Sequence, residues 1–379
     1  MNNLNNDHNV YILGAGFSAD RGLPVISNFM NLMRDAREWL LRKERVREAD
    51  AIAEVLRFRL RATSAAYRVK IDLENIEELF SLASAIDMQL SKNIQLAIAA
   101  TIDYCLNSKF PPLAHFKFDK AIKELIENNS KWEIDQNGEY SNAPLYEFYV
   151  SALIGALGEL HNGVGRNTFV TFNYDCLVEE ALSSLNVPYS YGFKPQAVIS
   201  DKSEVKLSLD WKSDLKVLKL HGSVNWAFSD DTSGKLTIYG SYLDVIENNL
   251  TPELIAPTWK KTFDGNLNQI WHESINELSI ATRIIVIGFS MPLTDMHFKY
   301  LLAAGLENNI SLREIVFVNP NCDELASRCE EVFGEIMFRT GKVKFINARI
   351  GQFVKQGSNM DTIGDFGRWI SAHIQHVMT

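Results

Sequence analysis

The chain has 379 residues, of which 46% are hydrophobic and 22% charged, and its formal net charge is -9. This length and composition fit a globular protein with one large domain or two to three smaller ones. The acidic balance disfavours a protein that holds nucleic acid by its phosphates, and no apolar run approaches the roughly 18 residues of a membrane span.

The four cysteines, at positions 105, 176, 322 and 329, form no Cys-x-x-Cys pair. The sequence therefore indicates neither a disulfide framework nor a zinc ribbon. The first residues lack the basic flank and apolar stretch of a secretion signal, so we expect a cytoplasmic protein. The basic cluster from Arg42 to Arg47 is interleaved with acids at helical spacing, which favours a solvated helix face over a patch for an anionic ligand.

Six short runs rich in β-branched and aromatic residues predict buried strands. In chain order they are Val10 to Leu13, Thr168 to Phe172, Val217 to Leu220, Ile284 to Ile287, Ile315 to Val318, and Val343 to Ile346. Most are followed by helical patterns, and they are continuously apolar rather than alternating. These features favour an α/β fold with a Rossmann-like, mostly parallel sheet that is covered on both faces.

Between the first two strands, about residues 27–165 show mainly the apolar spacing of helices. We interpret them as a large helical insertion in a single catalytic domain over 1–379. Asp72 is the expected N-cap of one of its helices, and residues 128–142 are an expected surface loop. A hairpin is expected around Ser233-Gly234. A C-terminal helix is predicted at about 364–378, packed on its own domain or docked on another subunit.

The first strand runs into Gly14-Ala15-Gly16-Phe17-Ser18-Ala19, which fits the loose Gly-x-Gly-x-x-Gly/Ala pattern. Such a turn lets a pyrophosphate approach the backbone and the unpaired N–H groups of a helix N-terminus. A tight strand-to-helix connection would give the same pattern. An ordinary dehydrogenase would also carry an acid at the end of a second strand about 20 residues later, but residues 31–62 have a helical pattern.

Polar residues also follow four other strands of the predicted sheet. They are Asn173-Tyr174-Asp175, His221-Gly222-Ser223, Gly288-Phe289-Ser290 and Asn319-Pro320. Each segment alone is typical of a turn. Ligands of an open parallel sheet lie outside the carboxyl ends of its strands, so the segments together predict a binding site at that edge.

These motifs resemble those of the sirtuin superfamily, and they occur in the family's order. Residues 14–24, 171–175 and 220–223 resemble its Gly-Ala-Gly-x-Ser-x-x-x-Gly-Ile-Pro, Thr-Gln-Asn-Ile-Asp and Leu-His-Gly-Ser motifs, and residues 288–290 and 318–319 resemble Gly-Thr-Ser and Ile-Asn. The likeness covers the α/β core, about half of the chain. Three features depart from it: Phe172 replaces glutamine, the peptide-pairing Phe-Gly-Glu segment is not evident, and no cysteine lies between 177 and 321 to build the zinc module of the deacetylases.

The pattern without zinc, with a helical segment from Asn75 to Leu79, is similar to bacterial sirtuin-like NADases of anti-phage defence. The resemblance implies that NAD is the substrate and that its nicotinamide–ribose bond is cleaved to give nicotinamide and ADP-ribose. It also implies NAD depletion in abortive infection, no metal, and a protein partner in trans such as a HerA-like ATPase or another phage sensor. We further expect a homo-oligomer and no contact with nucleic acid or a membrane.

The resemblance also implies a role for each site residue. Gly14, Ala15, Gly16, Phe17 and Ser18 would hold the pyrophosphate, and Gly288, Ser290 and Asn319 the adenosine half. His221 would bond a ribose hydroxyl or act as general base, Asn173 would position water or ribose, and Asp175 would orient either group or carry part of the oxocarbenium charge. Two alternatives stay open: an NAD-dependent deacylase or ADP-ribosyltransferase, and a non-catalytic subunit that binds NAD or ADP-ribose.

Overall fold

The computed structural model describes residues 8–69, 71–108, 145–154, 166–199, 207–228, 236–256, 265–291 and 296–351. Three predicted features lie outside these residues: the loop over 128–142, the turn at Ser233-Gly234 and the C-terminal helix over 364–378.

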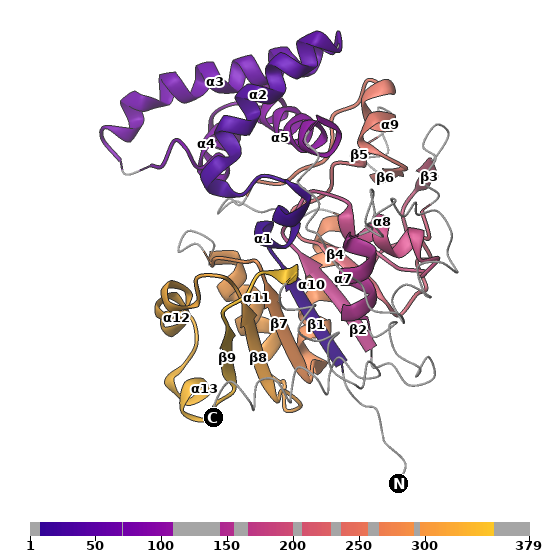
Figure 1. Cartoon of the computed structure of the whole chain (residues 1–379), viewed down its shortest axis with the longest axis vertical. Helices are drawn as coiled ribbons and strands as arrows, with labels where there is room; N and C mark the ends of the chain where they lie inside the picture. The colour runs from indigo at the N-terminus through magenta and orange to yellow at the C-terminus, as the bar shows by residue number, and fades with distance from the viewer. Residues whose placement is uncertain are drawn as a thin grey trace, which may run out of the picture.

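A six-stranded parallel sheet forms the centre of the molecule (Figure 1), and each of its strands matches one predicted from the sequence. The strands are β1 (His8–Leu13), β2 (Arg166–Thr171), β4 (Lys216–Lys219), β7 (Arg283–Ile287), β8 (Glu314–Val318) and β9 (Val343–Ile346). Their order is β4-β2-β1-β7-β8-β9. Counted along the chain this is 3-2-1-4-5-6, the order of a Rossmann fold, so the predicted α/β class is confirmed.

Helices cover both faces of this sheet, which is why its strands are continuously apolar. In Figure 1, α7 (Leu145–Leu153) and α8 (Leu177–Ser184) lie in front of the sheet, and α10 (Asn266–Ile280) and α11 (Met296–Leu306) lie behind it. The short helices α12 (Cys322–Glu330) and α13 (Glu335–Arg339) connect β8 to β9. Every residue of β1 is buried, because this strand lies in the middle of the sheet.

Four long helices between β1 and β2 pack on one another beyond the carboxyl ends of the strands (Figure 1). They are α2 (Phe29–Arg42), α3 (Val46–Ala66), α4 (Ile76–Ile86) and α5 (Met88–Ser108). The N-cap of α4 is Asn75, whose Oδ1 accepts from the N–H of Glu77, so the prediction of Asp72 was wrong. Asp72 instead accepts from the N–H of Glu74 in the preceding turn. That these helices form a separate insertion stays a prediction.

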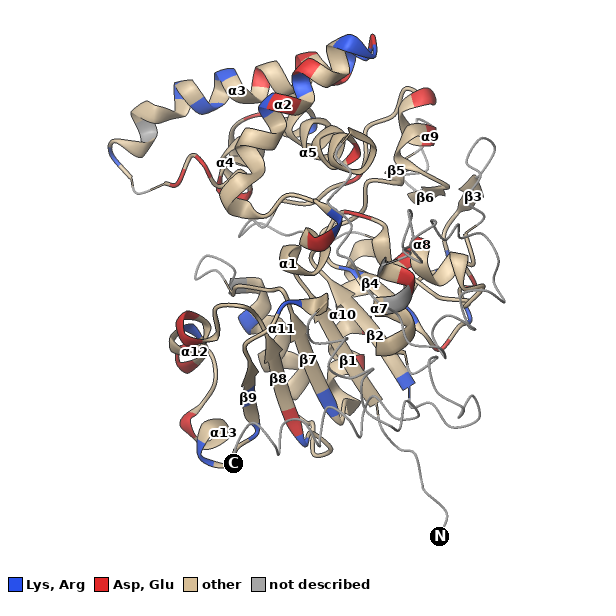
Figure 2. Ribbon diagram, in the orientation of Figure 1, with Lys and Arg blue, Asp and Glu red and all other residues tan. Residues whose placement is uncertain are grey.

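The basic cluster at the α2–α3 connection is mostly exposed, in agreement with the predicted solvated helix face. Arg42, Lys43 and Arg47 are exposed, whereas the partly buried Arg45 pairs with Glu48 at 2.6 Å. Figure 2 shows basic and acidic residues interspersed along α2 and α3. This surface therefore has no extended block of one charge.

A second, three-stranded sheet was not predicted. It pairs β3 (Ala197–Ile199) with β6 (Leu236–Tyr239) in parallel and β5 (Trp226–Phe228) with β6 in antiparallel. The antiparallel pair flanks the predicted hairpin turn, and α9 (Tyr242–Glu247) follows it. Two strands of this sheet, β3 and β5, have only three residues each, which is too short for a pattern to distinguish them from loops.

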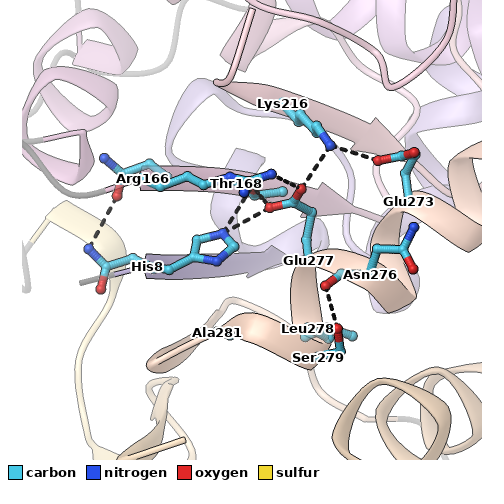
Figure 3. A network of polar contacts seen from close by, with 12 residues as sticks. His8, Arg166, Thr168, Lys216, Glu273, Asn276, Glu277, Leu278, Ser279 and Ala281 are labelled. Atoms are coloured by element: carbon cyan, nitrogen blue, oxygen red, sulfur yellow. Dashed lines mark hydrogen bonds and ion pairs between the residues drawn. The ribbon is translucent and has the colours of Figure 1, made fainter. Parts of the chain in front are cut away.

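At the amino ends of β1, β2 and β4, the buried carboxylate of Glu277 on α10 joins all three strands (Figure 3). It lies 2.9 Å from His8 Nε2 and 2.8 Å from Lys216 Nζ, pairs with Arg166, and accepts from Thr168 Oγ1 at 2.9 Å. Burial acts to raise the pKa of this carboxyl, but hydrogen bonds from His8 and Lys216 outweigh it and lower the pKa to about 2. The network holds the edge of the sheet opposite to the predicted site.

Candidate active site

The glycine turn after β1 lies between β1 and β7, where the strand order reverses, and it packs directly on the turn after β7. The N–H of Gly14 donates to the carbonyl of Ile287 at 3.0 Å, and that of Gly16 to the carbonyl of Gly288 at 2.8 Å. A Cβ on Gly16 would lie only 2.8 Å from the Cα of Gly288. The glycines are therefore required by the contact between two backbones.

This packing uses the N–H groups that were expected to be available to a pyrophosphate. Besides Gly14 and Gly16, the N–H of Phe17 is bonded, to the carbonyl of Gly14 at 2.9 Å. The expectation of unpaired N–H groups is therefore wrong for these three residues, because the turn closes onto β7 and onto itself. Contact of residues Gly14 to Ser18 with a dinucleotide stays a prediction.

Ser18, Asn173 and Asp175 form one hydrogen-bonded chain. The Ser18 hydroxyl donates to Asp175 Oδ2 at 2.7 Å and accepts from Asn173 Nδ2 at 3.0 Å. Asp175 Oδ1 accepts from the N–H of Leu177 at the start of α8. Ser18 is 2% exposed and Asp175 8% exposed, so water competes little for these bonds. These hydrogen bonds tie the short helix α1 (Ala15–Ser18), which follows β1, to the loop after β2.

The side-chain amide of Asn173 uses its nitrogen within the protein and presents its oxygen. Asn173 Nδ2 donates to the carbonyl of Gly14 and to Ser18 Oγ, each at 3.0 Å. In the part of the chain that the structure describes, no donor bonds to Asn173 Oδ1. An acceptor at this place suits a group that donates a hydrogen bond, such as a water or a ribose hydroxyl.

His221 follows β4 and is buried among aromatic rings. Its ring contacts the edge of Phe172, with centroids 5.2 Å apart, and lies 6.1 Å from the ring of Tyr174. Phe172 also stacks on Phe289 of the β7 turn at 4.9 Å. Phe172 therefore contacts both halves of the predicted site.

On the other side of the strand reversal lie Gly288, Ser290 and Asn319. Gly288 has a φ of +63°, and its N–H donates to the carbonyl of Val318 at 3.1 Å. Asn319 Nδ2 reaches the carbonyl of Phe289 at 3.5 Å, and Ser290 is exposed. The structure thus brings all the predicted site residues to one edge of the sheet; their roles toward a ligand stay predictions.

The sequence analysis missed a buried ion pair beside this edge. Lys219 of β4 is 0% exposed and Glu179 of α8 is 1% exposed, and Lys219 Nζ lies 2.9 Å from Glu179 Oε1. Lys219 Nζ also donates to the backbone carbonyl of Asp175. Burial acts to lower the pKa of Lys219, but the charge of Glu179 raises it on balance. A lysine inside the apolar run from Val217 to Leu220 was the signal, since lysine is almost never fully buried unless it is paired.

Glu253 was also missed, and it lies beside the His221 turn. Its carbonyl accepts from the N–H of Ser223 at 3.1 Å, and the adjacent Leu254 forms a bridge with Gly222. Burial raises the pKa of its carboxyl to about 7, although Lys92 acts to lower it. The segment that pairs with the residues after His221 therefore carries a carboxyl whose pKa is raised by burial.

The helices that precede β2 contact both sides of this edge. On α7, the Tyr146 hydroxyl donates to the carbonyl of Phe17 at 2.6 Å, and the Tyr149 hydroxyl donates to Asp20 Oδ2 at 2.9 Å. On α5, Gln95 Nε2 donates to the carbonyl of Leu254 at 2.6 Å. A movement of these helices would therefore displace the glycine turn and the turn that contains His221, because hydrogen bonds join them.

A groove of about 660 Å³ lies elsewhere, between α3, α4 and the start of α5, with Phe58, Leu82 and Leu90 among its lining residues. It includes none of the glycine turn, Asn173 or His221. The sheet edge stays the candidate active site, because convergent polar groups at a strand-order reversal are the better indicator of chemistry.

Among the described residues, no group of three or more His, Cys, Asp or Glu side chains could hold a metal ion. All four cysteines are free thiols. Over the same residues, no helix combines the length and apolar character needed to cross a membrane.

A search of the curated proteins found no significant match. Among solved structures, the chain is similar to one from a study of the mechanism and regulation of Sir2 enzymes, at 12% identity over 97% of this chain and 94% of that chain, with a TM-score of 0.41. It is also similar to Sir2Tm bound to a propionylated peptide (15% identity, 92% and 90%, TM-score 0.36) and to a Sir2 homologue variant in complex with ADP-ribose (12%, 98% and 93%, TM-score 0.37). Residues 167–331, which include Asn173, His221 and Gly288, match the family model of the SIR2-like domain.

Proposed function

We propose that the protein is an NAD+ hydrolase that cleaves the nicotinamide–ribose bond and releases nicotinamide and ADP-ribose. The observation that carries the proposal is the hydrogen-bonded chain of Ser18, Asn173 and Asp175 at the same sheet edge as His221. In a Rossmann sheet of this order, a dinucleotide binds at the reversal beside which these residues lie. The SIR2-like match over 167–331 supports a site that uses NAD.

Cleavage of this bond depends more on positioning of the substrate than on a general acid. Cleavage passes through an oxocarbenium-like state at the ribose carbon, and nicotinamide already carries positive charge in NAD, so it leaves without a strong acid. The protein has to hold the dinucleotide, stabilise the developing charge on ribose and direct a water.

The residues at the edge divide these tasks. Asn173 offers Oδ1 to a ribose hydroxyl or to the attacking water, and Gly14 and Ser18 fix the direction of its amide. Asp175 has both oxygens occupied, by Ser18 and the N–H of Leu177, and so acts as an orienting group. His221 bonds a ribose hydroxyl or takes the proton of the water, two roles that an imidazole commonly has in active sites.

The remaining predicted residues hold the rest of the dinucleotide. The turn from Gly14 to Ser18 lies against the pyrophosphate, and Gly288, Ser290 and Asn319 hold the adenosine half. Their place on both sides of the strand-order reversal supports this division.

The cellular role follows from the sequence resemblance. The enzyme depletes cytoplasmic NAD during abortive infection by phage, as a homo-oligomer that a partner in trans activates, either a HerA-like ATPase or another phage sensor. Because uncontrolled NAD hydrolysis would kill the host, the proposed activity requires that the enzyme be inactive until its partner activates it.

The direct test incubates the purified protein with NAD, alone and with a candidate partner, and separates the products by chromatography. Nicotinamide and ADP-ribose should appear, and Asn173→Ala and His221→Ala should each abolish their release. His272→Ala, which changes an exposed histidine of α10, is the matched control and should keep wild-type turnover.

Three outcomes would contradict the proposal. If either Asn173→Ala or His221→Ala kept near wild-type turnover, the catalytic role assigned to that residue would be wrong. Faster NAD-dependent removal of an acyl group from a lysine peptide than hydrolysis of NAD would identify a deacylase. Tight NAD binding in calorimetry without product, with every partner tried, would identify a binding subunit.

A further inference from the structure

We propose that the buried pair of Lys219 and Glu179 is a positioning device, which holds the loop of Asn173 and Asp175 in place relative to His221. The proposal rests on the function proposed above. It assigns a role in the reaction to two residues that would not touch the substrate.

The first support is what Lys219 contacts. Its ammonium group lies 2.9 Å from Glu179 Oε1 and also donates to the backbone carbonyl of Asp175. Glu179 in turn lies within 3.4 Å of the Tyr191 hydroxyl, which donates to it. One cation thus links β4, the loop after β2 and the first turns of α8.

The second support is where regular pairing stops. β2 and β4 pair as far as Thr171 and Lys219, and the N–H of Leu220 donates to the carbonyl of Thr171 at 3.0 Å. Beyond this point the ladder ends, and individual bonds join the loops that carry Asp175 and His221, among them the bond from the N–H of Val224 to the carbonyl of Tyr174 at 3.0 Å. The bond from Lys219 to Asp175 spans the two strands where the ladder ends.

The third support is energetic. On a strand buried on both faces, an apolar side chain would serve stability at least as well, because replacing a buried ion pair by packed apolar groups is often neutral or stabilising. An apolar side chain could not bond the carbonyl of Asp175. A lysine at position 219, neutralised by Glu179, can make this bond. Burying the ion pair costs desolvation free energy, and this cost is explained if catalysis needs the loop of Asn173 and Asp175 to be fixed in place.

The experiment compares two lysines of the same strand. Lys219→Met removes the pair at the site, and Lys216→Met removes a lysine that pairs with Glu273 and Glu277 at the other end of β4. At a temperature where both variants are folded, we expect kcat for NAD to fall roughly 100-fold in Lys219→Met, the order that small misplacements cost, with a smaller change in KM. In Lys216→Met, kcat should stay within about twofold of wild type.

The double variant Lys219→Met/Glu179→Met separates positioning from stability. Without an unpaired buried charge, it should melt above Lys219→Met, while kcat stays about 100-fold low. Recovery of kcat together with the melting temperature would show a merely structural pair and overturn the proposal. If the double variant does not fold, Lys219→Gln/Glu179→Gln takes its place, because it too leaves no unpaired buried charge.

A readout that needs no turnover keeps this test separate from the proposed function. Hydrogen exchange of amides 172–177 should become faster in Lys219→Met and in the double variant, but not in Lys216→Met. Unchanged exchange in all variants would overturn the proposal. Faster exchange in a protein whose wild type releases no nicotinamide would support the positioning role and refute the NAD hydrolase.

Discussion

Replacing Glu277 with glutamine should measure how much one buried carboxylate stabilises the amino edge of the sheet. The pKa of this carboxyl falls from 4.5 to about 2 on folding, because hydrogen bonds from His8 and Lys216 outweigh the effect of burial. At about 1.36 kcal/mol for each pKa unit, a gap of about 2.5 corresponds to ~3 kcal/mol of unfolding free energy at neutral pH. Its side chain is only 1% exposed, so little of this is lost to solvent screening.

The sign of the pH dependence follows from the lowered pKa. A carboxyl with a lower pKa in the folded state stabilises the protein fully above about pH 4.5, and this stabilisation is lost as the pH falls toward 2. Glutamine cannot ionise. The difference in unfolding free energy between wild type and Glu277→Gln should therefore be about 3 kcal/mol at pH 7 and should shrink below pH 4.5.

Urea unfolding followed by tryptophan fluorescence, at pH values between 7 and 3, would measure this difference. Glu273→Gln is the matched control on the same helix, because Glu273 bonds Lys216 at 2.6 Å with a side chain that is 27% exposed. We expect that control to cost less than about 1 kcal/mol. A Glu277→Gln deficit that stays constant from pH 7 to pH 3 would refute the reasoning, since it would come from packing rather than charge.

Three further predictions concern the site and its surroundings. Gly288→Ala should lower the free energy of unfolding by roughly 1–3 kcal/mol, and with it the melting temperature, because the alanine Cβ at φ +63° would lie 2.2 Å from the Phe17 nitrogen. An unchanged melting curve would contradict that contact. Tyr149→Phe should cost about 1.5–3 kcal/mol in urea unfolding through the lost bond to Asp20, and a neutral result would show that water replaces it. Dialysis against a chelator should leave nicotinamide release unchanged, and a loss of activity that zinc restores would disprove a metal-free mechanism.

Much of the main sheet was predictable from the sequence, for a local reason. A parallel strand covered on both faces is a continuous apolar run, so the runs from Val10 and from Val343 could be recognised without knowledge of their neighbours. The polar segments at Asn173 and His221 follow such runs directly. Their meeting at one edge could be inferred because parallel strands share their carboxyl ends.

What each polar group bonds to was decided by the tertiary structure alone. Gly16 meets Gly288, and Lys219 meets Glu179, only because the folded sheet places distant segments side by side. The short strands of the second sheet have too few residues for a pattern of their own. Hydrophobic periodicity is a property of a few consecutive residues, whereas a hydrogen bond or a close backbone contact depends on which other residue the fold brings to it.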